Sequence, residues 1–338
     1  MPPNLKEDTL LMISDFITTI PGVILGLAVG LVLILIGANY LVDGSSSIAK
    51  KFGLSEFVIG LTIVGIGTST PEMVVSFMSA IQGKAEMAIG NVVGSNIINT
   101  LLILGITALI SPLVITKDNL KKDIPLNIGV TVLLVLMGLK NTLFGIGADE
   151  LSRWDGAIFL LIFVIYMWRS FRSKTGGTDT EDDSIEIFPN WMSVIFIISG
   201  LIGLILGGKV FVNNAVRLAE TFRVSEKFIA ITIMALGTSL PELATCIVAA
   251  AKGRGQLALG NIIGSNISNI ILILGGASLI RPLSYSGITS VDSIMLIICS
   301  LAIFITAYTF TRNKIDRVEG AIFLGIEIAY LWFLLTQL

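Results

Sequence analysis

GIGTSTPE at residues 65–72 and GNVVGSNIIN at residues 90–99 both return in the second half of the chain, as ALGTSLPE at residues 235–242 and GNIIGSNISN at residues 260–269. In each half, a Gly-Thr-Ser stretch runs into a proline and a glutamate, and a Gly-x-x-x-Gly-Ser-Asn stretch follows in the next apolar run. Because proline and glycine interrupt regular helices, these stretches predict two equivalent irregular segments.

The similarity between the two halves extends beyond these motifs. Aligning residues 60–105 with residues 230–275 makes 21 of 46 positions identical. A second match, at a slightly smaller offset, pairs residues 153–168 with residues 317–332 and makes 9 of 16 positions identical. Chance does not explain this agreement, so the chain is a duplication that reaches the end of each half.

The composition is that of a membrane protein. The 338 residues are 54% hydrophobic and 14% charged, with a mean hydropathy of +0.90, which is too apolar for ordinary soluble domains. There is no histidine, and both cysteines lie in apolar runs, which argues against zinc or copper chemistry and against a disulfide framework. No stretch rich in lysine and arginine suggests a nucleic-acid partner.

Ten apolar runs are long enough to be membrane spans. The first is too long for a signal peptide and is expected to be retained. The runs lie at about 21–42, 55–81, 86–110, 124–139, 154–168, 191–212, 227–251, 256–280, 291–310 and 318–336. An acidic linker at residues 171–189 divides them into a first repeat, residues 1–170, and a second repeat, residues 190–338.

Five spans per repeat determine the topology. Because five is odd, the second repeat enters the membrane from the opposite side, as in transporters with inverted repeats. Loops after odd-numbered spans hold 13 Lys and Arg, against 9 in the remaining loops and termini. The positive-inside rule then places both termini outside the cell and the linker in the cytoplasm. The predicted fold is an all-α protein of the cell membrane, with ten transmembrane helices in two inverted five-helix repeats.

Glu72 and Glu242 lie within apolar spans at repeat-equivalent positions. A carboxylate at membrane depth costs several kcal/mol unless it faces a cavity and has a partner, so it usually marks a functional site. A single such residue can be a protonated acid bonded to a neighbouring helix, but a repeated pair is harder to explain in that way. Since neither span has a basic residue in its core, a bound cation is the expected counter-charge.

Polar oxygens surround each glutamate on the same helix face. Hydroxyl groups stand three and four residues before each glutamate, and the adjacent spans add a serine and an asparagine four residues apart. These residues are Thr68, Ser69, Ser95 and Asn99 in the first repeat and Thr238, Ser239, Ser265 and Asn269 in the second.

Two prolines add backbone oxygens to this set. Pro71 and Pro241 cannot donate a backbone hydrogen bond, so the carbonyls of Gly67 and Gly237 lose their helical partners and are free to point into a cavity. A kink that only shapes packing is the simpler alternative. Glycines 90, 94, 260 and 264 are expected to serve helix packing, and asparagines 91, 96, 261 and 266 to tie helices together.

An all-oxygen set with two carboxylates suits a hard cation. Ca²⁺ takes 6–8 oxygen ligands in flexible geometry, whereas Mg²⁺ dehydrates reluctantly. Two carboxylates neutralise one Ca²⁺, and the same groups can instead hold Na⁺ or protons. One site that binds competing cations is the basis of an antiporter.

The paired motifs resemble the two α-repeats of sodium/calcium exchangers in the calcium/cation antiporter superfamily, and the resemblance covers essentially the whole chain. It implies a core of spans 2, 3, 7 and 8 and mobile first and sixth spans. It also implies that the ion ligands are Thr68, Ser69, Glu72, Ser95, Asn99, Thr238, Ser239, Glu242, Ser265 and Asn269, with the backbone carbonyls of Gly65 and Ala235.

One ligand position departs from part of that family. Some members have aspartate where this chain has Asn269, so the site here holds no third carboxylate, which argues against potassium co-transport. The linker is short, and its acidic residues are expected to be a solvated segment rather than a regulatory Ca²⁺ site. Glu327, whose repeat equivalent is Phe163, is expected to make a local helix contact.

The favoured function is electrogenic exchange of Na⁺ for Ca²⁺, and the alternative is a Ca²⁺/H⁺ antiporter that uses the same two glutamates. An ion channel would need a continuous pore, and an intramembrane acid-pair hydrolase would not need the flanking oxygens. The sequence therefore predicts a transporter and not an enzyme. Its expected partners are Ca²⁺, Na⁺ or H⁺ and the lipid bilayer, with no cofactor and no obligate protein partner.

Overall fold

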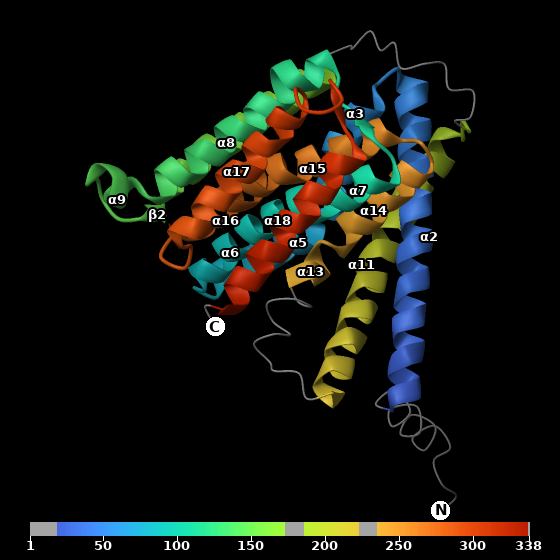
Figure 1. The fold of residues 1–338 in the computed structure, drawn as a ribbon, viewed down its shortest axis with the longest axis horizontal. Coiled ribbons are helices and arrows are strands. Elements are labelled where there is room, and N and C mark those ends of the chain that lie inside the picture. The colour runs from blue at the N-terminus through green and yellow to red at the C-terminus, as the bar shows by residue number, and fades with distance from the viewer. Residues whose placement is uncertain (1–18, 173–185, 223–234, 337–338) are drawn as a thin grey trace, which may run out of the picture.

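The computed structural model describes residues 19–172, 186–222 and 235–336, and these residues are largely helical (Figure 1). In chain order the elements are α2 (Ile20–Phe52), α3 (Glu56–Ile59), η1 (Gly60–Val64), α4 (Gly65–Thr68), α5 (Thr70–Ile81), α6 (Ala85–Ile98), η2 (Asn99–Ile103), α7 (Leu104–Ile110), β1 (Leu113–Val114), η3 (Asn119–Asp123), α8 (Ile124–Gly138), α9 (Lys140–Phe144), β2 (Glu150–Leu151), α10 (Arg153–Arg172), α11 (Asn190–Thr221), α13 (Ala235–Thr238), α14 (Leu240–Ala251), α15 (Gly255–Ser268), η5 (Asn269–Leu274), α16 (Gly275–Ile280), β3 (Leu283–Ser284), α17 (Ser290–Thr306), β4 (Lys314–Ile315) and α18 (Arg317–Thr336). The η segments are π-helical.

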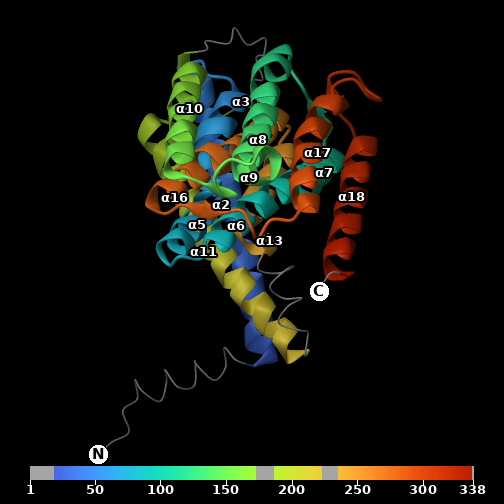
Figure 2. The same ribbon diagram turned by 90° about the vertical axis from the view of Figure 1, so that its left-hand side faces the viewer.

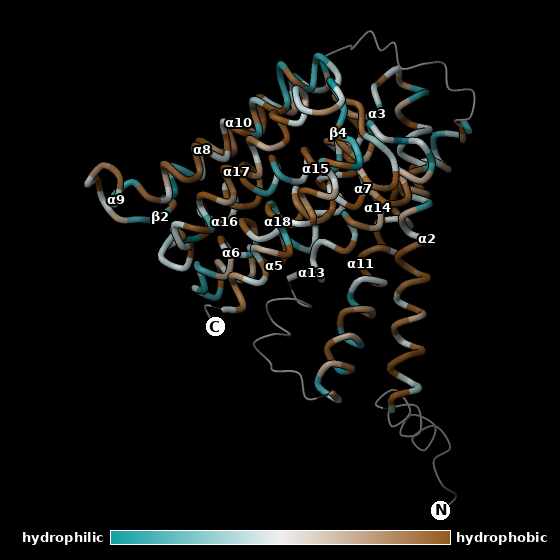
Figure 3. The backbone as a smooth tube through the Cα atoms, in the orientation of Figure 1, coloured by the Kyte–Doolittle hydropathy of each residue, from teal (hydrophilic) through white to brown (hydrophobic). Residues whose placement is uncertain are grey.

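Six described helices are long and apolar enough to cross a membrane, namely α2, α6–α7, α10, α11, α15–α16 and α18. A seventh candidate is the pair Glu56–Thr68 and Thr70–Ile81, which is bent by 48°. In α2, α10, α11 and α18, 28% or less of the most apolar part is buried, and these helices are largely apolar along their length (Figure 3), with many large apolar side chains exposed. Such exposed apolar helices are what a lipid-facing perimeter requires.

The sequence explains where α2 begins and ends. The Oγ1 atom of Thr19 accepts a hydrogen bond from the backbone N–H of Gly22 at 3.3 Å, and Pro21 lies in the first turn. Gly53 ends the helix in the left-handed conformation, with φ 63°. Lys50 and Lys51 lie in the last turn, where positive charge interacts favourably with the helix dipole.

The two longest helices, α2 and α11, pack side by side and extend beyond the rest of the bundle (Figures 1 and 2). Their backbones approach closely through glycines. A Cβ atom on Gly37 would lie 2.7 Å from the backbone N of Leu204, and one on Gly200 would lie 2.6 Å from the backbone N of Leu41. This is the small-residue packing by which membrane helices associate without a hydrophobic driving force.

The centre of the bundle is formed by α6–α7 and α15–α16, which carry the Gly-Ser-Asn motifs. The most apolar part of α15–α16 is 94% buried, and that of α6–α7 is 72% buried. A Cβ atom on Gly264 would lie 2.5 Å from the Cα of Leu61, so the packing role expected for this glycine is seen. The residue equivalent to Leu61 in the second repeat is 231, which is outside the described residues.

Two short β-pairs join the two halves of the chain. Strand β1 pairs with β4 through Leu113 and Ile315, and β2 pairs with β3 through Glu150 and Ser284. Strands β1 and β3 occupy the same place in their repeats, as do β2 and β4. Each half therefore gives one strand to the other half in a reciprocal way.

The helices follow the predicted runs, with three qualifications. The run at 55–81 is broken near its middle rather than continuous. Residues 227–234 of the seventh run lie outside the described residues, as does most of the linker at 171–189. The described helices that pass the length and apolarity test number six, or seven with the bent pair, so the predicted count of ten remains a prediction.

Candidate functional site

The site begins at two helix breaks. Helices α4 and α5 meet at Ser69, which has φ −76° and ψ 9°, and Pro71 follows in the first turn of α5. The arrangement recurs between α13 and α14, where Ser239 has φ −88° and ψ 4° and Pro241 follows. A new helix starts at each break, and each new helix carries an acidic residue in its first turn.

These acidic residues are Glu72 and Glu242, and each is only 1% exposed. The hydroxyl of Ser69 donates to Oε1 of Glu242 at 2.9 Å, and the hydroxyl of Ser239 donates to Oε1 of Glu72 at 3.2 Å. Each half of the chain thus hydrogen-bonds the glutamate of the other half. Because Ser69 precedes Glu72 by three residues, as Ser239 precedes Glu242, these crossed bonds bring the two carboxyl groups into one buried cluster. None of the ion pairs found within the described ranges includes either glutamate.

The asparagines that end the two motifs start segments that pack against the helices of the glutamates. Asn99 starts η2, which packs against α14 and hence against the helix of Glu242. Asn269 starts η5, which packs against α5 and hence against the helix of Glu72. Wide π-helical turns often occur at functional sites. Here both turns start at an asparagine that faces the opposite half of the chain.

Five oxygen atoms of this region are buried and have no hydrogen-bond partner among the described residues. They are Oε2 of Glu72, Oε2 of Glu242, Oδ1 of Asn99, Oδ1 of Asn269 and Oγ1 of Thr238. An unsatisfied buried polar group costs about 1–3 kcal/mol, so several at one place indicate a ligand that binds to oxygen. Four of the five can only accept, which selects a cation or a proton.

Another hydroxyl of the predicted set also reaches the opposite half of the chain. The Thr68 hydroxyl donates to the Val64 carbonyl at 3.0 Å and lies 3.1 Å from Oδ1 of Asn261. The set therefore combines the two halves of the chain around a pair of carboxyl groups.

Backbone oxygen atoms also enter the site, although not all as predicted. The Ser265 hydroxyl donates to the carbonyl of Gly65 at 3.2 Å, which places this carbonyl next to the second repeat. The prediction that the Gly67 carbonyl is free is wrong, because the Thr70 hydroxyl donates a hydrogen bond to it at 2.7 Å. Leu240 stands at the position equivalent to Thr70 and has no hydroxyl, so the repeats differ at this point.

The other predicted ligands have simpler descriptions. Ser95 lies in α6 and is buried, and Ala235 is the first residue of α13. No cluster of three or more Cys, Asp or Glu that could hold a metal occurs in the described part of the chain, which contains no histidine. The candidate site therefore combines only two carboxylates with neutral oxygens.

Glu327, another acid buried in the bundle, is 2% exposed and lies three residues before Tyr330 on α18. Its Oε2 atom has no hydrogen-bond partner within the described ranges. Its role as a local helix contact stays a prediction.

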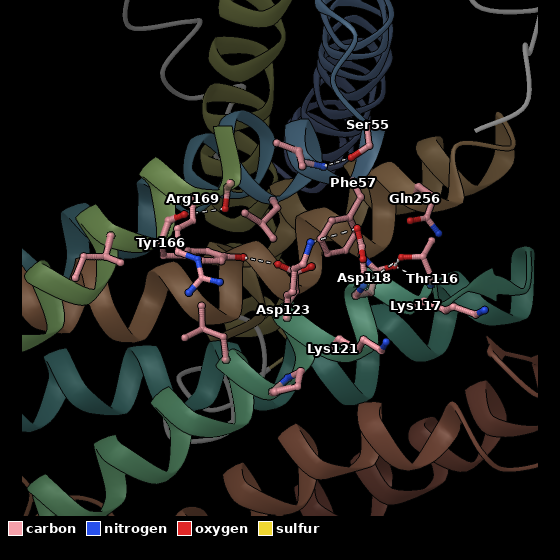
Figure 4. Close-up of a pocket in the computed structure, with 18 of the residues that line it drawn as sticks. Ser55, Phe57, Thr116, Lys117, Asp118, Lys121, Asp123, Tyr166, Arg169 and Gln256 are labelled. Carbon is pink, nitrogen blue, oxygen red and sulfur yellow. Dashed lines mark hydrogen bonds and ion pairs between the residues drawn. The ribbon is translucent and has the colours of Figure 1, made fainter. Parts of the chain in front are cut away.

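A cavity of about 980 Å³ lies elsewhere, between α3, η3, α8 and α10 (Figure 4). It is lined by charged residues, including Lys117, Lys121 and Arg169, and by apolar side chains such as Phe57. The Tyr166 hydroxyl donates to Asp123 at 3.3 Å within it. Neither Glu72 nor Glu242 lines this cavity, so it is distinct from the site between the motifs.

Comparisons with known proteins agree on one family. The family model described as sodium/calcium exchanger protein matches residues 22–172 and 192–336. Putative antiporter CaxA of Alkalimonas amylolytica is 37% identical over 318 residues, covering 91% of this chain and 97% of the relative. Sodium/calcium exchanger MaX1 of Methanosarcina acetivorans is 34% identical over 337 residues, covering 90% and 96%.

A solved structure shows the same fold. The sodium-calcium exchanger NCX_Mj, soaked with zero Na⁺ and Ca²⁺, superposes with a TM-score of 0.80 at 33% identity. The match covers 94% of this chain and all of the other. The arrangement of helices described above is therefore that of a solved membrane exchanger.

Proposed function

The chain belongs to the sodium/calcium exchanger family, and from this premise we propose that it exchanges Na⁺ for Ca²⁺ across the membrane by alternating access. It is a membrane cation antiporter and not an enzyme. The transport site proposed here is built on Glu72 and Glu242. Its ligands are the side chains of Thr68, Ser69, Glu72, Ser95, Asn99, Thr238, Ser239, Glu242, Ser265 and Asn269, with the carbonyls of Gly65 and Ala235.

The observation that carries this proposal is the group of buried oxygens without donors. A cation at the site would satisfy Oε2 of both glutamates and Oδ1 of Asn99 and Asn269 together. The hydroxyls of Ser69 and Ser239 would then turn their hydrogens away and offer lone pairs to the ion. Hydrogen bonding in the ion-free protein is thus replaced by coordination.

Charge supports Ca²⁺ as one cargo and Na⁺ as the other. Two carboxylates carry −2 and neutralise one Ca²⁺ with oxygens alone, as this ion requires. The same oxygens can hold Na⁺ ions, and three of them, the number that the family resemblance implies, would leave the site one charge more positive. Binding of the two cargoes is mutually exclusive, because both need the same carboxylates.

A Ca²⁺/H⁺ antiporter remains the alternative. Each glutamate has one oxygen that accepts a serine hydroxyl and one that is free, so a proton could occupy the free oxygen. Asn99 and Asn269 favour Na⁺, because amides coordinate ions without titrating.

The proposed topology has ten spans in two inverted repeats. Residues 55–81, broken at Ser69, form span 2, and α13 with α14 forms the described part of span 7. The reciprocal pairing of β1 with β4 and β2 with β3 supports a two-fold relation between the repeats. We place both termini outside and the 171–189 linker in the cytoplasm, following the count of Lys and Arg.

The moving part in this proposal is the pair of α2 and α11. These helices pack on each other through glycines and lie at the perimeter, whereas α6 and α15 are fixed in the centre. Sliding of the pair past the core would open the site to one side and then to the other. The resemblance to the family implies the same division.

The test measures ⁴⁵Ca²⁺ uptake by purified protein in liposomes loaded with Na⁺. Glu72→Gln and Glu242→Gln should each abolish uptake, because one carboxylate leaves Ca²⁺ half neutralised where water cannot compensate. Glu327→Gln is the matched control, since it removes another buried acid outside the site, and it should retain uptake.

Size-exclusion profiles and thermal unfolding in detergent establish that each variant is folded. Near-normal uptake by either folded site variant would show that the transport site lies elsewhere. Loss of uptake in all three variants would show only that buried acids matter, and would remove the assignment to Glu72 and Glu242.

A further inference from the structure

Two asparagines outside the proposed ligand set stand directly behind it. Asn96 and Asn266 occupy equivalent positions in the two repeats, three residues before the ligands Asn99 and Asn269, and each is 3% exposed. Asn99 Nδ2 donates to Asn266 Oδ1 at 3.1 Å, and Asn269 Nδ2 donates to Asn96 Oδ1 at 3.0 Å. Each ligand amide is therefore held by the opposite repeat.

The direction of these bonds is set by backbone atoms. Asn96 Nδ2 donates to the backbone carbonyl of Asn266 at 3.0 Å, and a carbonyl can only accept. The nitrogen of Asn96 must face that carbonyl, so its Oδ1 atom faces Asn269. Reversing the amide of Asn96 would place two acceptors against each other.

The orientation of the Asn266 amide is set by a threonine. The Thr100 hydroxyl donates its single hydrogen to the backbone carbonyl of Asn96 at 3.0 Å, so it can only accept from Asn266 Nδ2, which lies 3.0 Å away. Asn266 Oδ1 must then face Asn99. Ile270 stands at the position equivalent to Thr100, so a hydroxyl at this position orients the amide of Asn266 but not that of Asn96.

We propose that Asn96 and Asn266 are positioning residues that orient the amides of Asn99 and Asn269 with their oxygens toward the transported cation. Each ligand amide must present its nitrogen to the acceptor behind it, which leaves Oδ1 on the other side, buried and without a partner. This inference rests on the proposed function, because it assumes that the oxygens bind the ion. Groups behind a metal ligand commonly orient it in this way.

The test compares Asn96→Leu and Thr100→Val with a control that removes a half-buried amide elsewhere. Asn91→Leu serves as this control, because among the described residues the Asn91 amide donates to the Glu72 carbonyl and the Ser76 hydroxyl, both within its own half. Both test variants should raise the half-saturating Ca²⁺ concentration of exchange by roughly 10-fold or more, as loss of an outer partner does at metal sites. The control should lower the unfolding temperature without a comparable rise.

Double variants separate positioning from general packing. In the background of Asn269→Ala, adding Asn96→Leu should cause no further rise, because the ligand that Asn96 orients is gone. Thr100→Val should be non-additive with Asn99→Ala but additive with Asn269→Ala. Thr100→Val is close in shape to the native residue, so it keeps the proposal testable if Asn96→Leu does not fold.

The possible outcomes distinguish this inference from the proposed function. If Asn269→Ala and Asn99→Ala leave the half-saturating Ca²⁺ concentration unchanged, the ligand assignment itself is wrong. If they raise it while Asn96→Leu and Thr100→Val do not, the positioning role alone is refuted. Additivity of every pair would likewise overturn it.

Discussion

An ion pair on one side of the bundle should bias alternating access. Lys252 Nζ lies 2.7 Å from Asp43 Oδ1, which ties α2 to the end of α14. The equivalent positions are Gln82 and Asn213, which carry no charge. Since α2 belongs to the moving pair in the proposed mechanism, this contact must break when the linker side opens. We therefore expect Asp43→Asn to favour opening on that side.

The structure bounds the size of this effect. The two side chains are 31% and 39% exposed, and ion pairs of this kind contribute about 0.2–1 kcal/mol. The ratio of open to closed forms should then rise roughly 1.4- to 5-fold. The half-saturating Ca²⁺ concentration should fall by up to this factor on the linker side and rise on the opposite side.

The assay measures half-saturating Ca²⁺ from each side in vesicles of known orientation. Lys252→Met should reproduce the effect of Asp43→Asn, and the exchanged pair Asp43→Lys with Lys252→Asp should restore native values. The reasoning is refuted if both sides change equally, or if the single variants act additively and the exchanged pair does not recover.

Two further predictions concern packing and topology. Gly37→Ala should destabilise the protein by about 1–3 kcal/mol, because its Cβ would overlap the backbone of α11, and should lower the thermal unfolding midpoint in detergent. Gly325→Ala, where a Cβ meets no described atom within 4 Å, should not lower it, and equal loss in both variants would contradict the close packing. Single cysteines replacing Lys117 and Ser286, which lie in equivalent loops of the two repeats, should react with impermeant reagents from opposite sides. Labelling of both from one side would exclude inverted repeats.

Much of the site could be predicted because the two repeats agree. Glu72 and Glu242 are identifiable from the sequence since a carboxylate in an apolar span needs a partner, and the structure joins their two motifs through crossed hydrogen bonds from Ser69 and Ser239. Pro71 and Pro241 marked where the helices break. A carboxylate in an apolar span and a proline within a helix each carry a free-energy cost that can be recognised from the residue type alone. Their repetition in both halves of the chain argues against a purely structural explanation.

Other features depend on contacts that no pattern in the sequence reveals. The Gly67 carbonyl was expected to be free, but the neighbouring Thr70 hydroxyl bonds it. The direction of the Asn96 and Asn266 amides follows from backbone carbonyls of the opposite repeat. The repeat pattern itself hides such differences, because it aligns Thr100 with Ile270 and Asp43 with Asn213 without showing what each one contacts.

Na⁺ coupling is tested most directly by measuring ⁴⁵Ca²⁺ flux and current together in proteoliposomes with a Na⁺ gradient or a pH gradient. Na⁺ coupling predicts that Ca²⁺ moves only when Na⁺ moves the other way. If three Na⁺ exchange for one Ca²⁺, one net charge crosses per cycle, and membrane potential biases transport by about 2.3 kcal/mol per 100 mV. Exchange that persists with choline in place of Na⁺, follows the pH gradient and produces no Na⁺-dependent current would contradict it and identify a proton-coupled antiporter.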